Sequence, residues 1–150
     1  MKPLRKMKSG YFGIGVFNPK NQINIGTLWR SANNFGADFI FTIGKRYDKQ
    51  SSDTCKTFRH IPLYHYKTFA ELNSHRPYSA QLIAIEQTET SKDIKNFVHP
   101  KQAIYLLGAE DYGIPTKILK KCQAVVHIST PMCLNVAVAG SIIMFDRQNK

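Results

Sequence analysis

The chain alternates between short apolar runs and segments whose apolar residues recur at helical spacing. The apolar runs are typical of strands that are buried on both faces, and they lie at Tyr11–Phe17, Phe39–Gly44, Gln81–Glu86, Ala103–Gly108 and Ala124–Ile128. Helical patterns lie at Asn24–Phe35, Thr68–Asn73 and Thr116–Lys120, and a last helix begins at Asn135. Strands that alternate with helices predict an α/β fold, with a parallel sheet flanked by helices.

The first predicted helix has one apolar face. The residues on that face would belong to the core, and they are Ile25, Leu28, Trp29, Ala32, Phe35 and Gly36. Arg30 lies nearly opposite them, so we expect it to point away from its own sheet. An outward arginine is usually no more than a solvated residue. Here, however, Asn24 is placed to cap the helix, and Gly26 leaves room for something to approach its first turn.

The last helix is apolar on almost every side from Val136 to Phe145. This run is shorter than the roughly 20 residues that span a bilayer, so we expect it to be buried against protein. Pro131 breaks the segment before it, which we expect to be an irregular loop.

Composition limits the possibilities further. A chain of 150 residues, 43% hydrophobic and 11% aromatic, suits one globular domain over residues 1–150. Residues 1–9 form a basic tail without the apolar stretch of a signal peptide. The histidines are scattered, and the cysteines (Cys55, Cys122 and Cys133) have no paired spacing. This favours neither disulfides nor a metal site, and it points to a reducing, cytoplasmic location.

The balance of charge gives the first functional signal. The formal net charge is +11, the isoelectric point is about 9.7, and no acidic residue precedes Asp38. Clustered lysines and arginines gain affinity for polyanions by releasing condensed counterions, so nucleic acid is the favoured partner. Basicity that serves only solubility is the alternative. A membrane surface is less well supported, because the basic tail has no amphipathic apolar face.

A long basic loop is predicted between residues 45 and 60, and we assign RNA contacts to it. Basic and aromatic residues are interleaved there: Lys45, Arg46, Tyr47, Lys49, Lys56, Phe58, Arg59 and His60. This combination suits phosphate contacts together with base stacking, and loops of this length are often functional. The alternative is a surface loop that is polar without binding anything.

Two familiar patterns do not hold in this chain. Gly10, Gly13 and Gly15 begin a predicted strand, whereas a dinucleotide fingerprint places its glycines after a strand and at the start of a helix. No serine has the sequence context of a nucleophile elbow, so a hydrolase triad is not supported.

Three segments carry a resemblance that covers nearly the whole chain. They are NIGTLWRSANNFGADFIF at 24–41, IYLLGAEDYGIP at 104–115 and VHISTPMCLNVAVAGSIIMFDR at 126–147. In this order they resemble the signature motifs of the SpoU/TrmH family of RNA 2'-O-methyltransferases, in the SPOUT superfamily. The length, without an added RNA-binding domain, is similar to that of minimal TrmL-like members. The resemblance implies a SPOUT-type α/β knot, with a deep trefoil knot at the C-terminus, and a homodimer.

That knotted dimer would suit the last helix. The small residues at 137–140 would let it pack closely, and its all-round apolarity asks for burial by the knot and by a partner subunit.

The resemblance implies methyl transfer from S-adenosylmethionine (AdoMet) to a ribose 2'-hydroxyl of RNA, with tRNA favoured over rRNA. Arg30 matches the arginine that assists deprotonation. We expect it to stabilise or position, since a guanidinium does not normally give up its proton. Asn24 would position the active-site loop. Glu110 would order a loop or act directly, and Asn135 matches the asparagine of the third motif.

In this family AdoMet is held largely by backbone groups. The matching positions are Ile85, Glu86, Leu107, Gly108, Ile128, Cys133 and Leu134. Gly108 would let the main chain approach the ligand closely. The side chains of Leu107, Ile128 and Leu134 would enclose the adenine.

The third motif departs from the family pattern. Cys133 and Ala137 stand where serines are usual, and Ser129-Thr130 replaces a frequent Ile-Pro. These changes leave open a rival function, a non-catalytic RNA-binding module on the same fold. The retained Arg30, together with the glutamate and asparagine of the other motifs, favours the enzyme. Methylation of a base is a third possibility, and the Asn–Arg pair of the first motif argues against it by resemblance.

Overall fold

The computed structural model describes residues 10–48 and 60–150. The predicted basic tail, and Lys49, Lys56, Phe58 and Arg59 of the predicted basic loop, lie outside the described residues. Within these two ranges, no helix has both the length and the apolar character needed to cross a membrane.

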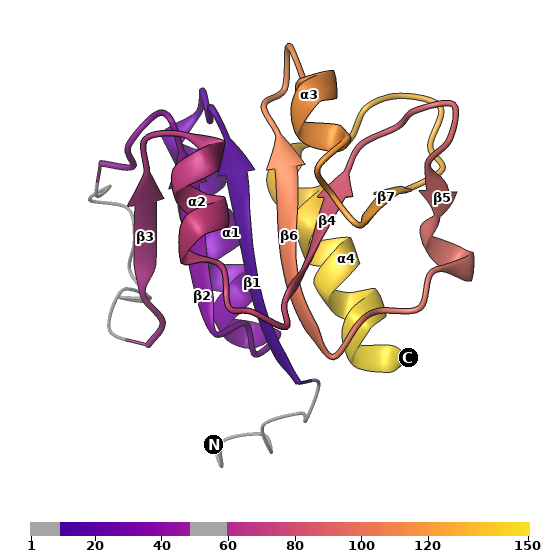
Figure 1. Cartoon of the computed structure of the whole chain (residues 1–150), viewed down its shortest axis with the longest axis horizontal. Coiled ribbons are helices and arrows are strands. Elements are labelled where there is room, and N and C mark those ends of the chain that lie inside the picture. The colour runs from indigo at the N-terminus through magenta and orange to yellow at the C-terminus, as the bar shows by residue number, and fades with distance from the viewer. Residues whose placement is uncertain (1–9, 49–59) are drawn as a thin grey trace.

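A seven-stranded parallel sheet forms the centre of the fold (Figure 1). Its strands are β1 (Tyr11–Phe17), β2 (Phe39–Ile43), β3 (Leu63–Tyr66), β4 (Gln81–Ile85), β5 (Lys92–Asp93), β6 (Gln102–Gly108) and β7 (Ala124–His127). Their order is β3-β2-β1-β6-β4-β7-β5, and neighbouring strands are parallel throughout. The predicted parallel sheet flanked by helices is confirmed.

The strands β3 and β5 were not predicted from the sequence. Both lie at the edges of the sheet. The residues of β3 are half-buried or exposed, and β5 has only two residues. Edge strands of this kind need no run of buried apolar residues, so the pattern that marks the inner strands is missing from them.

Helices cover both faces of the sheet. They are α1 (Gln22–Asn34), α2 (Phe69–His75), α3 (Thr116–Leu119) and α4 (Val136–Asn149), with a 3-10 turn, η2, at Ile94–Asn96. In Figure 1, α2 lies in front of the sheet and α1 and α4 lie behind it. The prediction that Asn24 caps the first helix is wrong. Asn21 is the cap, and its side chain accepts a hydrogen bond from the backbone N–H of Ile23.

The glycines of β1 make room for aromatic rings. Alternate residues of β1 face the apolar layer beneath α1 and α4. The glycines between them face the opposite layer, where a Cβ on Gly13 would overlap the ring of Phe39 and one on Gly15 would overlap that of Phe41. Packing of β2 against β1 therefore accounts for these glycines without any nucleotide.

The helix α4 packs very closely against α1 and the sheet. A Cβ on Gly140 would lie 2.5 Å from Cδ1 of Leu28 and 3.1 Å from Cδ1 of Leu107. The expected close packing is thus confirmed at this glycine. Burial on every side is not reached within one chain, because Val138 is 47% exposed and Phe145 is 58% exposed.

These exposed side chains border a shallow apolar hollow of about 320 Å³ between the two helices. We call it the α1–α4 hollow. It is lined by Thr27, Phe35, Ala137, Val138, Ser141, Ile142 and Phe145.

A buried polar cluster fastens the end of α4 to the amino edge of the sheet. This amino-edge network consists of His99, Tyr105, Asp146, Arg147 and Lys150. The guanidinium of Arg147, a residue only 5% exposed, donates to the carbonyl oxygens of Pro100 and Lys101 at 2.7 and 2.8 Å. It also donates to the hydroxyl of Tyr105 at 2.9 Å.

The imidazole of His99 lies between two members of this network. Its Nδ1 is 2.7 Å from the Tyr105 hydroxyl, and its Nε2 is 2.8 Å from Oδ2 of Asp146. Burial lowers the pKa of His99 below its ordinary value, although Asp146 opposes this effect. Burial also raises the pKa of Tyr105 to about 12.

Candidate functional site

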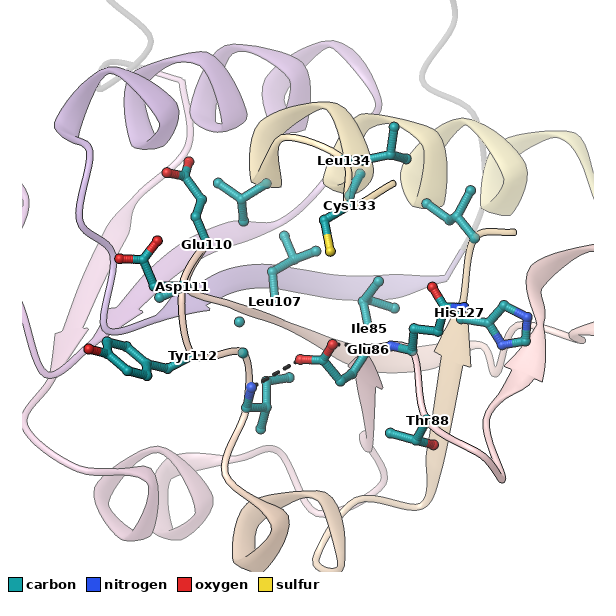
Figure 2. Close-up of a pocket in the computed structure, with 18 of the residues that line it drawn as sticks. Ile85, Glu86, Thr88, Leu107, Glu110, Asp111, Tyr112, His127, Cys133 and Leu134 are labelled. Carbon is teal, nitrogen blue, oxygen red and sulfur yellow. Dashed lines mark hydrogen bonds between the residues drawn. The ribbon is translucent and has the colours of Figure 1, made fainter. Parts of the chain in front are cut away.

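Three neighbouring strands end together at the carboxyl edge of the sheet. In their register Leu107 of β6 lies beside Ile85 of β4, and Ile85 lies beside Val126 of β7. The loops that leave these strands enclose a cavity of about 450 Å³ (Figure 2). Parallel α/β sheets commonly bind ligands at this edge, and the volume lies within the range of small-molecule sites.

Every position that the resemblance assigns to the cofactor lines this cavity. These positions are Ile85, Glu86, Leu107, Gly108, Ile128, Cys133 and Leu134. They come from three parts of the chain: the ends of β4 and β6, and the loop between β7 and α4. The structure therefore brings together residues that are far apart in the sequence.

The carboxylate of Glu86 fastens the loop that follows β6. Its Oε2 accepts a hydrogen bond from the backbone N–H of Ile114 at 3.0 Å, and its Oε1 accepts one from that of Gln87 at 3.1 Å. Gly113 has a φ of +62° and lies against this carboxylate, where a Cβ would overlap it. A glycine is required here both for the backbone conformation and for the space.

Gly108 serves the same loop. A Cβ at this position would lie 2.6 Å from the backbone carbonyl carbon of Gly113 and 2.9 Å from the backbone nitrogen of Ile114. We expected Gly108 to let the main chain approach a ligand. The structure shows that its missing side chain lets the loop fold back upon the end of β6. Gly108 also lines the cavity, and the approach of its main chain to a ligand stays a prediction.

The asparagines and the glutamate of the three motifs are joined by hydrogen bonds. The amide of Asn24, a residue only 8% exposed, donates to the carboxylate of Glu110. Asn135 donates from Nδ2 to Oδ1 of Asn24 at 2.9 Å. The Oδ1 of Asn135 accepts from the backbone N–H groups of Ala137 and Val138 and so caps α4. This chain of bonds ties α1 and α4 to Glu110, which itself lines the cavity.

Arg30 is not part of this group. It lies six residues after Asn24 on α1, is exposed and does not line the cavity. Its expected orientation away from its own core is confirmed. Any role at a cofactor cavity therefore requires a second copy of the chain or a bound substrate to bring the two together.

The described part of the predicted basic loop is only partly available to RNA. Lys45, Arg46 and His60 are exposed. Tyr47 is half-buried, and its ring packs against Trp29 in a T-shaped arrangement with centroids 5.9 Å apart. Its hydroxyl, 3.3 Å from the position of a Cβ on Gly26, fills the space that was expected to admit a ligand.

Among the cavity residues that were not singled out from the sequence are Thr88, Tyr112 and His127. The Nδ1 of His127 is 2.9 Å from the hydroxyl of Ser91, and its Nε2 is 3.9 Å from Oδ2 of Asp93. The backbone N–H of Lys95, followed by the Ser129 hydroxyl, holds the pKa of Asp93 below its ordinary value. His127 lies within the third motif, but no neighbouring sequence spacing marks it.

Metal-ligating side chains do not converge in this region. Across residues 10–48 and 60–150, no group of three or more His, Cys, Asp or Glu side chains is placed to hold a metal ion. Cys133 is a free thiol, exposed at the cavity, and Cys122 is a free thiol elsewhere. Burial raises the pKa of Cys122 to about 11.

Comparison with known proteins identifies relatives of this chain. The SpoU rRNA Methylase family matches residues 12–145, which is most of the chain. A curated mouse protein, the tRNA (guanosine(18)-2'-O)-methyltransferase TARBP1, is 26% identical over 134 residues, or 82% of this chain. The chain spans only 8% of that relative's length.

Solved structures share the fold at lower identity. A protein studied for 2-OH methylation of C/U34 on tRNA is 20% identical, with a TM-score of 0.80 over 93% of this chain and 95% of that one. The AdoMet complex of AviRb from Streptomyces viridochromogenes is 21% identical, with a TM-score of 0.83 over 98% and 59%. The TrmH/SpoU tRNA modifying enzyme of A. aeolicus is 17% identical, with a TM-score of 0.84 over 96% and 77%.

A parallel sheet that carries a loop-enclosed cavity at its carboxyl edge, together with this family match, marks a member of an RNA methylase family. More particularly, the chain belongs to the SpoU rRNA Methylase family, whose cofactor is AdoMet.

The cavity residues suit AdoMet. The apolar side chains of Leu107, Ile128 and Leu134 offer the surfaces that an adenine ring needs. Thr88, another lining residue, has a buried hydroxyl without a hydrogen-bond partner among the described residues. A cavity of about 450 Å³ is large enough for a ligand of this kind.

Proposed function

We propose that this protein transfers the methyl group of AdoMet to a ribose 2'-hydroxyl of tRNA and that it works as a homodimer. The observation that carries the proposal is the hydrogen-bonded chain of Glu110, Asn24 and Asn135 at the cavity. One residue comes from each of the three motifs. The relatives named above, one acting on the 2'-O of guanosine 18 and one on the 2-OH of C/U34, both of tRNA, support the ribose and the tRNA.

The chemistry requires a ribose hydroxyl to lose its proton, finally to water, while its oxygen forms a bond to the methyl carbon. The carbon–sulfur bond breaks, and S-adenosylhomocysteine leaves. Bound AdoMet supplies an electrophilic methyl group on a positively charged sulfur. The carboxylate of Glu110 accepts a hydrogen bond from Asn24, which supports a loop-ordering role for Glu110. A nearby cation would then stabilise the developing negative charge on the ribose oxygen, and Arg30 is the candidate.

Arg30 would act in the cavity of the partner subunit. It is exposed and does not line the cavity of its own chain. The α1–α4 hollow lies on the same pair of helices and leaves Val138 and Phe145 uncovered. A second copy that covers this hollow would remove the apolar surface from water and bring Arg30 to a cavity.

A trefoil knot is part of the same proposal. The segment that runs from β4 to β6 contacts the last turns of α4 through Ile94, Phe97 and Pro100. These contacts place the end of the chain beside this segment, and the knot itself is inferred from the family match.

The direct test is incubation of the protein with labelled AdoMet and separate pools of tRNA and rRNA, followed by mapping of the methylated nucleosides. Label in 2'-O-methylated nucleosides from tRNA is expected. Label only on bases, or only in rRNA, would contradict the proposal. Binding of RNA without any transfer would favour the rival, a non-catalytic RNA-binding module.

The cross-subunit site has a separate test. Arg30→Ala should abolish transfer while AdoMet binding, measured by calorimetry, stays nearly unchanged. Gly108→Val should disable the cavity, because its side chain would displace the loop at Gly113. Mixing the two inactive variants forms some dimers in which an intact Arg30 meets an intact cavity, so part of the activity should return. If subunits exchange and activity stays absent, Arg30 does not act across the interface.

A further inference from the structure

Tyr112 is an exposed aromatic residue at the rim of the cofactor cavity. It lies in the loop between β6 and α3, lines the cavity and is 87% exposed. In Figure 2 it extends from the loop on the same side as Glu110 and Asp111, away from the middle of the cavity. A single exposed tyrosine needs no explanation by itself, and Tyr78 is also fully exposed. The place of Tyr112 beside the candidate active site sets it apart.

The loop holds this ring in place without burying it. Ala109 and Gly113 pair across the loop as an antiparallel bridge, with a hydrogen bond of 3.0 Å from the Gly113 N–H to the Ala109 carbonyl. The carboxylate of Glu86 fixes the following residue, Ile114. Tyr112 therefore projects from a fastened turn, and a flat ligand could bind to it with little ordering of the backbone.

A lysine accompanies the ring. The ammonium of Lys20, in the loop between β1 and α1, is 5.5 Å from the centroid of the Tyr112 ring and also pairs with the carboxylate of Asp111. The lysine occupies only a small part of the ring surface, because Tyr112 remains 87% exposed. An accessible aromatic face next to a cation is the combination that receives a nucleobase and its phosphate.

We propose that Tyr112 is a stacking platform for a base of the RNA substrate, with Lys20 beside it to meet a phosphate. The inference rests on the proposed function, in that RNA must approach this cavity. It also adds an exposed ring to the predicted basic loop, in which Tyr47 is half-buried and packs against Trp29. The net charge of +11 favours RNA over a protein surface as the occupant.

The test compares variants of the full chain in binding to unfractionated tRNA, measured by filter retention at fixed salt. Tyr112→Ala should weaken binding by about fivefold to a hundredfold, the range found when one stacked base loses its aromatic partner. Tyr112→Phe should bind like the unaltered protein. Tyr112→Leu should bind as weakly as the alanine variant, since a leucine is apolar but offers no flat face. Tyr78→Ala is the matched control and should have no effect.

Lys20→Gln should reduce the slope of log affinity against log salt by about one unit, whereas Tyr112→Ala should leave that slope unchanged. Affinity for AdoMet should stay the same in Lys20→Gln and Tyr78→Ala. In Tyr112→Ala it should fall by less than the affinity for tRNA, because the ring extends away from the middle of the cavity. The platform is wrong if Tyr112→Ala binds tRNA within twofold of the unaltered protein. It is also wrong if that variant loses AdoMet binding or dimerisation to the same extent. Failure of the unaltered protein to bind or methylate any RNA would remove the proposed function and the platform together.

Discussion

The amino ends and the carboxyl ends of the parallel strands form two opposite edges of the sheet, which we call the amino edge and the carboxyl edge. They use opposite kinds of hydrogen bonding. At the amino edge, the buried cation Arg147 donates to the carbonyl groups of Pro100 and Lys101. At the carboxyl edge, the acceptors Glu86 and Asn135 take hydrogen bonds from backbone N–H groups and leave a cavity beside them. Each edge thus fixes irregular segments of the chain, but only one does so while keeping space open.

The difference separates stability from function within one small protein. A charge that is fully enclosed must keep its partners, because an unpaired buried charge is very costly. Half-buried side chains can be changed at lower cost, since water can replace a lost partner. We therefore expect changes at the amino edge to act mainly on folding and changes at the carboxyl edge to act mainly on cofactor and transfer.

The largest effect is expected at the amino edge. Arg147→Met should lower the free energy of unfolding by about 3–5 kcal/mol, because the polar groups around the guanidinium lose their donor. The AdoMet affinity of the molecules that still fold should change little. Urea unfolding and calorimetry measure the two quantities. Arg46→Met, at an exposed position, is the control. If Arg147→Met lowers the free energy of unfolding by less than about 1 kcal/mol, the proposed contrast between the two edges is wrong.

At the carboxyl edge, Asn24→Ala should reduce methyl transfer by roughly a hundredfold, since it removes the link that positions Glu110 and Asn135. Its cost in unfolding free energy should be smaller, about 1–3 kcal/mol, as for the lost hydrogen-bond partner of an uncharged buried polar group. Single-turnover rates and urea unfolding are compared with those of Asn34→Ala, an exposed residue on the same helix. Equal rates in the two variants would count against the hydrogen-bonded chain as a positioning device.

A change at Glu86, which holds the loop after β6, should have a smaller effect again. Glu86→Gln keeps the shape but replaces one acceptor oxygen by a donor, so one of its two backbone N–H partners loses its bond. We expect AdoMet affinity to fall roughly tenfold, or about 1.4 kcal/mol, with little loss of stability. Glu89→Gln, an exposed neighbour, is the control. A drop in stability without a change in AdoMet affinity would show that Glu86 supports folding and not cofactor binding.

The smallest effect is a dependence on pH at the amino edge. Burial lowers the pKa of His99, so the folded state favours the neutral imidazole. Its contribution to stability is complete above the ordinary histidine pKa of about 6.5 and is lost as the pH falls through the lower folded value. Unfolding measured between pH 7 and pH 5 should show this loss in the unaltered protein, and less of it in His99→Gln. His75→Gln, at an exposed site, should keep the full dependence.

The inner strands could be predicted from sequence because they are buried on both faces and show continuous apolar runs. The edge strands β3 and β5 lack that burial, and so they lack the signal. The cap of α1 was misplaced because Asn21 and Asn24 are equally suited to capping by residue type. Only the packing of the helix shows that Asn24 turns inward to Glu110.

The sequence predicted which residues form the site, but it did not predict how they are held in place. The cavity positions followed from the family motifs, and all of them line one space. The roles of Gly108 and Glu86 depend on the way in which the loop after β6 folds back, which no spacing reveals. The aromatic residues show the same limit, because composition alone could not show that Tyr47 is half-buried against Trp29 while Tyr112 is exposed.

The position of Asn135 in the sequence has a consequence for synthesis. The ribosome completes β4 and β6 long before it reaches the segment from Ile128 to Val136, which supplies the last wall of the cavity. Asn135 caps the final helix and also donates a hydrogen bond to Asn24. A chain that has not yet passed this point carries two walls of the cavity without the third. We therefore expect AdoMet binding to require that the segment from Ile128 to Val136 is in place.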